Sequence, residues 1–435
     1  MREMVSFALP LILMSAASAV NAFVDRLFLS WHSDVAVQAV VPAVSLAGTF
    51  SCLAVGTVGC VSALAAQAHG RGDSRGTRAA FAQGIFLSCL FLPLFAAAWP
   101  VGCALISIAG HSADVAAAER AAFAVLLPSG GVSVFAAALG GYFAALGRTR
   151  VVGIAGVVGS VVNLALDPLL VFGAGPVPSL GIVGSALATL AASFAAVGWM
   201  ALAVAADFRR QPLAGVCRLD AAKFIALLRL GLPYGAMSLF CGLVFTAFVM
   251  ATGRCDALSL AVSNVAFGIN GIYYMVASAL REGTTSFVAR SIGAGDYAAA
   301  RCAVRSSLLL AVLCSTAFSI LVLLGSGFFA LLFHDSGSSF DPTRYRETLA
   351  AVLAVMCVRT FAEGASETFA GALRGAGETV SILRVRVLCG GLCWIPLVFL
   401  ASWCGASIGA LWMTMPVYLA LSAFFLRRRW LRIIG

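Results

Sequence analysis

The sequence predicts an all-α polytopic membrane protein with twelve transmembrane helices in two pseudo-symmetric six-helix lobes. Three observations predict this fold: an apolar composition, recurrent apolar runs of helical length, and an internal duplication. Of the 435 residues, 61% are hydrophobic and only 11% are charged, whereas a soluble domain carries roughly 25% charged residues. The composition therefore excludes a water-soluble globular protein.

Twelve apolar runs account for most of the chain, and a helix of about 20 apolar residues crosses a hydrocarbon core about 30 Å thick. The expected spans are 5–31, 36–66, 79–109, 121–147, 151–173 and 180–206, followed by 224–252, 258–289, 302–333, 347–373, 379–402 and 405–426. The runs lack the alternation of β-barrel strands, so we expect helices. The first run is long and contains Asp25, which favours a retained helix over a signal peptide.

Basic residues gather in alternate loops. If each run crosses the membrane once, 21 of the 28 Lys and Arg residues fall on one side. The positive-inside rule identifies that side as the cytoplasm. We therefore expect a multi-pass protein of the plasma (inner) membrane with both termini cytoplasmic. The net charge of +10 is spread over short loops, which argues against a nucleic-acid partner.

Motifs of the first half recur in the second half. The matching pairs are Leu9-Pro10 with Leu232-Pro233, Gly70–Asp73 with Gly293–Asp296, and 141–149 with 371–379. We therefore expect an amino-terminal lobe at 1–206, a cytoplasmic linker at 207–222 and a carboxyl-terminal lobe at 223–435. Because each lobe has six spans, the lobes are parallel repeats, an architecture typical of transporters.

A family resemblance rests on six segments in order. These are Pro10 to Asp25, Gly70–Asp73, Asn163–Pro168, Gly181–Thr189, Gly293–Asp296 and Gly371–Thr379. With them the sequence resembles the multidrug and toxic compound extrusion (MATE) family of cation-coupled antiporters over nearly its whole length. The resemblance implies a proton- or sodium-coupled antiporter that exports amphipathic or cationic organic compounds by alternating access.

Two other functions compete with this interpretation. A lipid or lipid-linked oligosaccharide flippase of a related fold would need a cationic cavity for phosphate. The charged residues near the middle of the predicted spans are instead mainly acidic. A membrane-embedded enzyme would need a catalytic cluster, but the four histidines are in separate loops: His32, His69, His111 and His334. We therefore expect a transporter and not an enzyme.

Ionisable residues inside the spans indicate functional or structural roles, because placing each charged side chain in the membrane costs about 2.5–3.5 kcal/mol on insertion scales. By helical rise, Asp25 lies about 30 Å and Asp167 about 24 Å from the cytoplasmic ends of their helices. Asn163 precedes Asp167 by four residues and shares its face. Two carboxyl groups and an amide in the outer half of the first lobe are suited to binding H⁺ or Na⁺.

The resemblance implies the same cation site for these three residues, with a hydroxyl from the sixth span. Ser185 and Thr189 share one face of that span, and Thr189 is our prediction. Two alternatives stay open. Asp25 can be an interface residue beside Arg26, and Asp167 can be a cap before the following proline.

Pro10 removes one backbone hydrogen bond from the first helix and permits a kink. The resemblance implies that it marks a bend of this helix. A role in packing alone is the alternative.

In the second lobe, Arg359, Glu363 and Glu367 step by four along one helix. One guanidinium beside two carboxylates leaves a negative face, a candidate second ion or substrate site. The alternative is a buried Arg359–Glu363 pair that holds the bundle. One branch of the resembling family has a Glu where this chain has Cys241, which favours proton coupling through the first lobe. Arg281 and its neighbour Glu282 are expected to snorkel or pair locally.

No metal site or cofactor is expected besides the coupling ion, H⁺ or Na⁺. The thirteen cysteines lie mostly within apolar runs, and Cys389 with Cys393 is the nearest pair. The Gly-rich turns lack the Gly-Lys-Ser/Thr element of a phosphate loop. The expected partners are small organic substrates and membrane lipids, and we expect a monomer.

Overall fold

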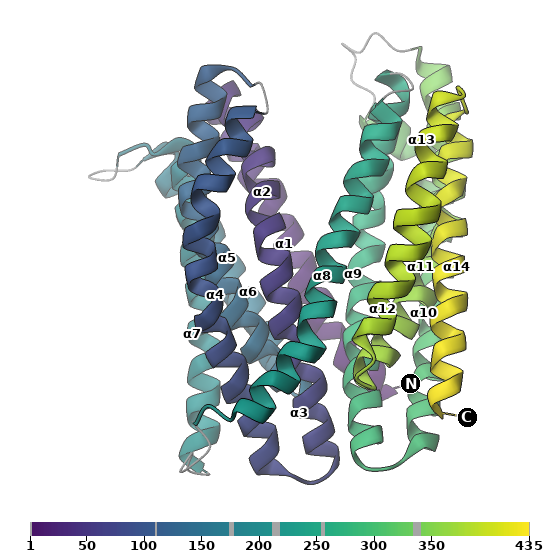
Figure 1. The fold of residues 1–435 in the computed structure, drawn as a ribbon. Coiled ribbons are helices and arrows are strands. Elements are labelled where there is room, and N and C mark those ends of the chain that lie inside the picture. The colour runs from purple at the N-terminus through teal and green to yellow at the C-terminus, as the bar shows by residue number, and fades with distance from the viewer. Residues whose placement is uncertain are drawn as a thin grey trace. The chain divides into compact units, whose positions relative to one another are not determined.

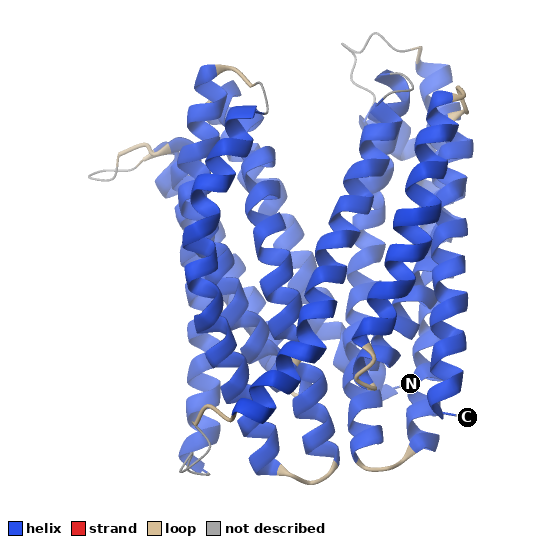
Figure 2. Cartoon of the chain, in the orientation of Figure 1, coloured by secondary structure: helices blue, strands red, loops and turns tan. Residues whose placement is uncertain are grey.

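Helices make up nearly all of the part of the chain that the computed structural model describes, which is residues 2–108, 111–173, 178–210, 218–253, 257–333 and 341–434 (Figures 1 and 2). No strand occurs among these residues. The all-α prediction is therefore confirmed.

Each predicted span corresponds to one helix or to two or three consecutive helical segments. The first half contains α1 (Arg2–His32), α2 (Asp34–Gly59), α3 (Val61–Gly70), α4 (Ser74–Ile108), α5 (Ala113–Ala145), α6 (Thr149–Phe172) and α7 (Gly181–Arg210). The second half contains α8 (Ala221–Gly253), α9 (Ala257–Gly293), α10 (Tyr297–Phe333), α11 (Pro342–Gly375), α12 (Thr379–Arg386), the π-helical segment η1 (Val387–Trp394), α13 (Ile395–Trp403) and α14 (Ile408–Ile434).

Eleven helical segments within the described ranges are long and apolar enough to cross a membrane, with α2–α3 and α12–α13 each counted as one. The predicted span 258–289 corresponds to α9, which is not among the eleven although it has 37 residues. Polar side chains such as Asn264 and Asn270 lower its hydropathy. Length and continuity, rather than hydropathy, identify α9 as the twelfth span.

Several helices run past their predicted ends. The last span was expected to end at residue 426, but α14 continues to Ile434 through a run of arginines. Similarly, α4 begins at Ser74 rather than at residue 79. The apolar pattern marks only the part of a helix that needs hydrocarbon around it, while backbone hydrogen bonds continue into the polar region.

Contacts divide the chain into two compact units, one of residues 9–238 and one of residues 1–8 with 239–435. Two helices are therefore shared: α1 passes from one unit to the other after Ala8, and α8 does so after Ser238. Met4 and Phe7 are buried in the second unit, where the Phe7 ring lies 5.6 Å from that of Phe287. The lobe boundaries at 206 and 223 stay a prediction, and part of the expected linker lies outside the described residues.

The duplicated Gly-rich motif forms the same turn in both units. Between α3 and α4, Gly72 has a φ of +74°, and Asp73 Oδ1 accepts a backbone N–H three residues on at 2.7 Å. Between α9 and α10, Gly295 has a φ of +77°, and Asp296 Oδ1 accepts the corresponding N–H at 2.8 Å. Positive φ favours glycine at this position, so each motif is a capped helix–helix turn, as the sequence predicts.

The first unit depends on close helix contacts through glycine. A Cβ atom at Gly235 of α8 would lie 2.3 Å from the carbonyl oxygen of Leu53 on α2. One turn earlier, a Cβ at Gly231 would lie 2.3 Å from the carbonyl oxygen of Thr57. Only glycine allows these two backbones to approach so closely.

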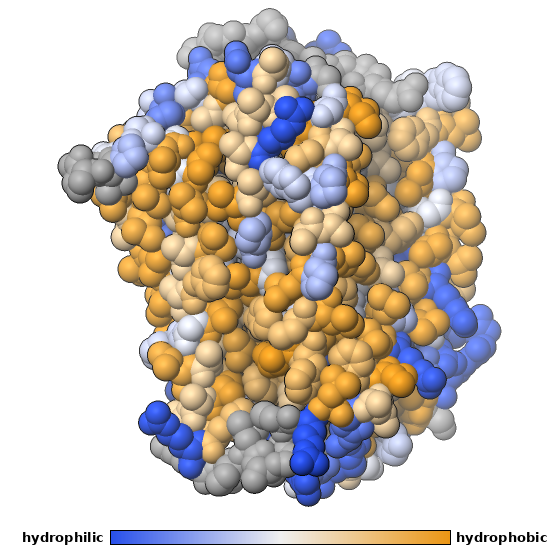
Figure 3. All heavy atoms as spheres, turned by 60° about the vertical axis from the view of Figure 1, so that its left-hand side comes forward, coloured by the Kyte–Doolittle hydropathy of each residue, from blue (hydrophilic) through white to orange (hydrophobic). Residues whose placement is uncertain are grey.

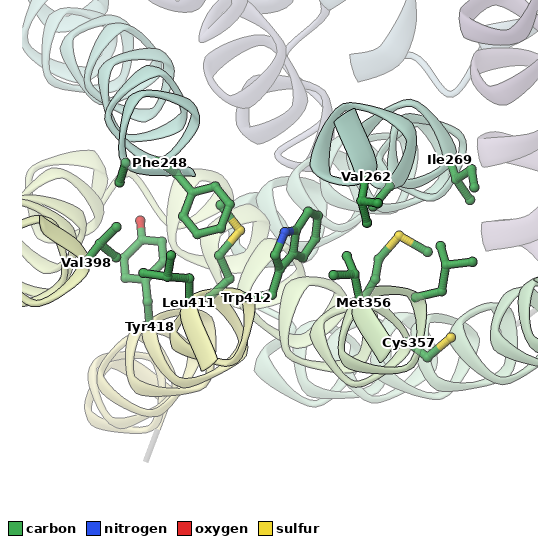
Figure 4. Close-up of a cluster of buried hydrophobic side chains, with 14 of the residues drawn as sticks. Phe248, Val262, Ile269, Met356, Cys357, Val398, Leu411, Trp412 and Tyr418 are labelled. Carbon is green, nitrogen blue, oxygen red and sulfur yellow. The ribbon is translucent and has the colours of Figure 1, made fainter. Parts of the chain in front are cut away.

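Aliphatic and aromatic side chains together fill the core of the second unit (Figure 4). Trp412 of α14 is fully buried, and its Nε1 donates a hydrogen bond to Ser263 Oγ of α9 at 2.9 Å. Its ring contacts Phe248 edge-on, with the centroids 5.6 Å apart. The indole therefore satisfies its one polar group while it joins three helices.

Apolar side chains also cover most of the middle of the face in Figure 3, and hydrophilic side chains gather toward its upper and lower ends.

Outside the spans, Glu378 binds Arg429 of α14 at 2.8 Å. Burial raises the pKa of the Glu378 carboxyl group, but hydrogen bonds from Ser381 and Arg429 outweigh burial, and the net pKa is lowered.

Candidate ion-binding site

The site is formed by α1, α6 and α7 within the unit 9–238. The end of α6 and the start of α7 are held together by the Leu180 N–H, which donates to the Leu170 carbonyl oxygen at 2.9 Å. A Cβ atom at Gly184 would lie 2.4 Å from that same oxygen. The lack of a side chain at Gly184 thus lets α7 begin directly against α6.

The end of α1 is fastened to the same place. His32 Nε2 lies 3.0 Å from Ser179 Oγ in the α6–α7 connection, and Ser179 donates to the Val171 carbonyl oxygen at 2.8 Å. The Phe28 ring lies 6.0 Å from that of Phe172. These contacts fix the three helix ends relative to one another.

Nearer its start, α1 lies closely along α6. A Cβ atom at Gly153 would lie 2.8 Å from Pro10 Cβ, and one at Gly156 would lie 2.2 Å from Met14 Cγ. Pro10 therefore packs against a glycine of α6, and this contact is compatible with both the packing and the bending role expected of it.

The carboxyl groups of Asp25 on α1 and Asp167 on α6 lie close enough to interact electrostatically, and the Ser185 side chain of α7 lies next to Asp167. Asp167 is 0%, Asn163 3% and Ser185 4% exposed. Among the described residues, none donates a hydrogen bond to Asp25 Oδ1, to Asn163 Oδ1 or to either carboxylate oxygen of Asp167.

This arrangement is unfavourable for two bare carboxylates. An ionised carboxylate removed from water without donors costs several kcal/mol, and a second negative charge nearby adds repulsion. A proton or a small cation between the two groups removes both costs. The chemistry of the oxygens therefore fits a site that holds one positive charge.

Three of the predicted residues, Asp25, Asn163 and Asp167, are brought together in this way. Asp167 lies inside α6, more than a turn before its end at Phe172, and not at a solvent-exposed cap. The hydroxyl next to Asp167 is that of Ser185, while the Thr189 hydroxyl donates to the Ser185 carbonyl oxygen at 3.1 Å. The sequence analysis selected Thr189, but spacing alone does not separate two residues on one helical face.

The acids of the second unit are paired. Glu367 accepts hydrogen bonds from Arg281 Nη1 at 2.6 Å and from Arg386 Nη2 at 2.8 Å. Arg359 Nη2 donates to Glu363 Oε1 at 3.1 Å. The local pair expected on α9 is present, with Arg281 Nε 3.7 Å from Glu282 Oε1. It is also joined to α11, because Arg374 Nη1 binds Glu282 Oε1 at 2.5 Å.

This cluster differs from the expected negative face. Its charged members are Arg281, Arg359, Arg374 and Arg386 with Glu282, Glu363 and Glu367, so guanidinium groups exceed carboxylates by one. Arg386 lies at the start of the predicted span 379–402, next to a basic turn, but it is only 3% exposed and lies inside the bundle. The sequence alone does not distinguish an Arg in a loop from an Arg that is buried at the polar start of a span.

Within the described ranges, no group of three or more His, Cys, Asp or Glu residues is placed to hold a metal ion. The fold defines a polytopic helical membrane protein, and the carboxyl pair inside its helices is a candidate ion site of the kind that ion-coupled transporters use.

Comparison with known proteins gives the family. The MatE family model matches residues 10–169 and 233–400, and the chain therefore belongs to the MATE family of membrane transporters. The chain is 28% identical over 388 residues to the probable multidrug resistance protein NorM of Pseudomonas putida, which covers 86% of this chain and 81% of the relative. It is 29% identical to the NorM of Deinococcus radiodurans over 87% of this chain and 83% of the relative.

A solved structure of MATE in complex with MaL6 has the same fold, with a TM-score of 0.88 and 18% identity over 99% of this chain and 96% of that one. Family membership confirms the predicted resemblance. It also confirms that the protein is a transporter and not an enzyme.

Proposed function

We propose that the protein exports amphipathic or cationic organic compounds in exchange for protons, and that Asp25 and Asp167 share the exchanged proton. The observation that carries this proposal is the pair of interacting carboxyl groups, with Asp167 buried and Asp25 half-buried. Among the described residues, Asp25 Oδ1 and both Asp167 oxygens accept no hydrogen bond. The relatives named multidrug resistance proteins support the substrate class. Sodium is the alternative ion, because the same oxygens suit a small cation.

Coupling requires that the ion and the substrate favour different states. A proton on the pair leaves one negative charge and allows both groups to stay buried together. Loss of that proton restores the repulsion and favours an arrangement in which α1 moves away from α6 and α7. A cationic substrate favours the deprotonated protein, so that protons and substrate are bound in turn.

Pro10 is the proposed bend of α1 in this cycle. Proline lacks an N–H group, so α1 has one hydrogen bond fewer there. The division of α1 between the two compact units falls after Ala8, two residues before Pro10. A bend at this point leaves residues 1–8 in place, while the part of α1 after Pro10 moves away from α6 and α7.

The proposed setting is the inner membrane with both termini cytoplasmic, a monomer, and no cofactor besides the coupling ion. The segregation of 21 basic residues supports this orientation. Figure 1 marks the N- and C-terminal ends near the same end of the unit 1–8 with 239–435, in line with an even number of crossings.

Ethidium export, measured as uptake into everted vesicles under an imposed pH or Na⁺ gradient, tests the proposal. We expect the pH gradient to drive efflux by the wild type and Asp25→Asn and Asp167→Asn each to abolish the gradient dependence. Asp34→Asn, at the exposed start of α2, is the matched control and retains it. Unchanged dependence in both site variants contradicts the shared site, and dependence on Na⁺ alone identifies sodium as the ion.

A second candidate is the flipping of a lipid or lipid-linked oligosaccharide. The excess of one guanidinium in the second unit favours it, because a phosphate group needs a cationic partner. Transport of a fluorescent lipid phosphate in proteoliposomes without any ion gradient would support this candidate. Gradient-driven ethidium efflux without lipid movement contradicts it.

A further inference from the structure

A cavity of about 580 Å³ lies on the unit 9–238, along α5 where it packs against α4 and α7. Its walls are apolar except at one end, where Arg209 contributes. Representative wall residues are Phe81, Ile85, Phe135, Leu139, Val197 and Ala205. This volume is in the range of small-molecule sites, and it belongs to helices other than α1 and α6 of the carboxyl site.

The cavity is elongated along α7. Its lining residues on this helix extend from Val197 to Arg209, which is about 18 Å at the rise of an α-helix. That length is more than half of a hydrocarbon core of about 30 Å. Ala201 and Ala205 are exposed alanines in the floor, and their small side chains leave a groove that a single extended acyl chain can follow.

The end of the groove near Arg209 is basic. The Phe208 ring packs against Tyr142 at 6.2 Å between centroids, and Tyr142 interacts electrostatically with Arg78, Arg148 and Asp207. Arg148 forms an ion pair with Asp207. Three arginines, counting Arg209, thus face one carboxylate at this end.

We propose that the groove binds an anionic phospholipid, with one acyl chain on the apolar walls and the phosphate group at Arg209. Basic pockets between transmembrane helices recognise anionic head groups, and an acyl chain is the one apolar ligand that is always present beside such a wall. An organic cation does not fit, because it would meet the excess positive charge at the basic end. The groove shares α7 with the carboxyl site, but none of its lining residues belongs to that site.

Head-group selectivity follows from charge. A zwitterionic lipid offers the same acyl chains but no net charge, and each Arg near the surface contributes about 1 kcal/mol to binding an anionic lipid. Removing the charge of Arg209 should therefore lower the preference for anionic lipid about fivefold. Filling the groove should lower the binding of both lipids.

Native mass spectrometry of the purified full chain, with equal amounts of dioleoyl phosphatidylglycerol and dioleoyl phosphatidylcholine, measures this preference. We expect the wild type to retain mainly phosphatidylglycerol, Arg209→Gln to lose about fivefold in the ratio of the two lipids, and Ala205→Trp to retain less of both. Arg428→Gln, an exposed cation of α14 in the other unit, is the control and keeps the wild-type ratio.

Equal retention of the two lipids by the wild type overturns the proposal, and so does an equal loss in Arg209→Gln and Arg428→Gln. The melting temperature with added phosphatidylglycerol provides a second readout. It should rise for the wild type and for Arg428→Gln, and less for Arg209→Gln. The absence of any such difference also overturns the proposal.

Discussion

Glu367→Gln is the most informative change in the second unit. The Glu367 carboxylate is bound on both sides, by Arg281 at 2.6 Å and by Arg386 at 2.8 Å, and its side chain is only 11% exposed. The substitution removes the carboxylate that both guanidinium groups share, and Arg281 keeps the more distant carboxylate of Glu282, at 3.7 Å. Breaking one buried pair costs about 3–5 kcal/mol, so we expect a loss of at least this size in the free energy of unfolding.

Glu363→Gln is the comparison, because Glu363 pairs with one guanidinium, that of Arg359, at 3.1 Å. It should destabilise the protein less than Glu367→Gln does. Adding Arg386→Met to Glu367→Gln removes one stranded cation, so the double variant should be more stable than Glu367→Gln alone. Such non-additivity is expected of residues in one ion-pair network.

Unfolding in mixed micelles of dodecyl maltoside and dodecyl sulfate, followed by tryptophan fluorescence, measures these differences. Ethidium efflux per folded molecule is measured in parallel, and it should persist in Glu367→Gln when the folded protein is reconstituted. Wild-type stability together with lost efflux would refute the reasoning, because Glu367 would then be a functional ion ligand and not a structural counter-ion.

Three further predictions concern packing and pH. Gly235→Leu should lower the free energy of unfolding by about 1–3 kcal/mol through overpacking against α2. Gly242→Leu in the same helix should be near neutral, because no atom lies within 4 Å of its Cβ position. The same unfolding assay measures both variants. Trp412→Ala should lower the free energy of unfolding by about 3–5 kcal/mol. Trp403 is 84% exposed, so Trp403→Ala should lower it far less. Equal effects would contradict the placement of Trp412 in the core. The pKa of Glu378 is lowered in the folded protein, so its ion pair stabilises the protein fully above the unfolded pKa of about 4.3 and this contribution is lost as pH falls through the lower folded pKa. The stability difference from Glu378→Gln, below about 1 kcal/mol, should therefore shrink as pH falls below about 4.3 in the same unfolding assay.

The sequence was sufficient for the helices and for the carboxyl site because both follow from the cost of placing polar groups in hydrocarbon. Asp25, Asn163 and Asp167 stand out in apolar helices, and helical rise places the two carboxyl groups at similar depth. The choice between Ser185 and Thr189 could not be made in this way. It depends on the rotation of α7 against α6, which close contact at Gly184 sets.

The second unit shows a different limit. Arg386 follows a basic turn, and hydropathy places it at the membrane surface, yet it is buried against Glu367. Burial of this cation depends on a carboxylate nineteen residues away on another helix, and no local pattern records that pairing. The shared helices α1 and α8 were missed for the same reason, because membership of a compact unit is decided by tertiary contacts.

The central claim is that one proton is shared by Asp25 and Asp167 and is given up when substrate binds. Proton release from the purified protein on addition of ethidium, recorded with a pH-sensitive dye in weakly buffered detergent solution, tests it most directly. The account predicts release by the wild type and by Asp34→Asn, and none by Asp25→Asn or Asp167→Asn. Release that persists undiminished in both site variants would contradict it.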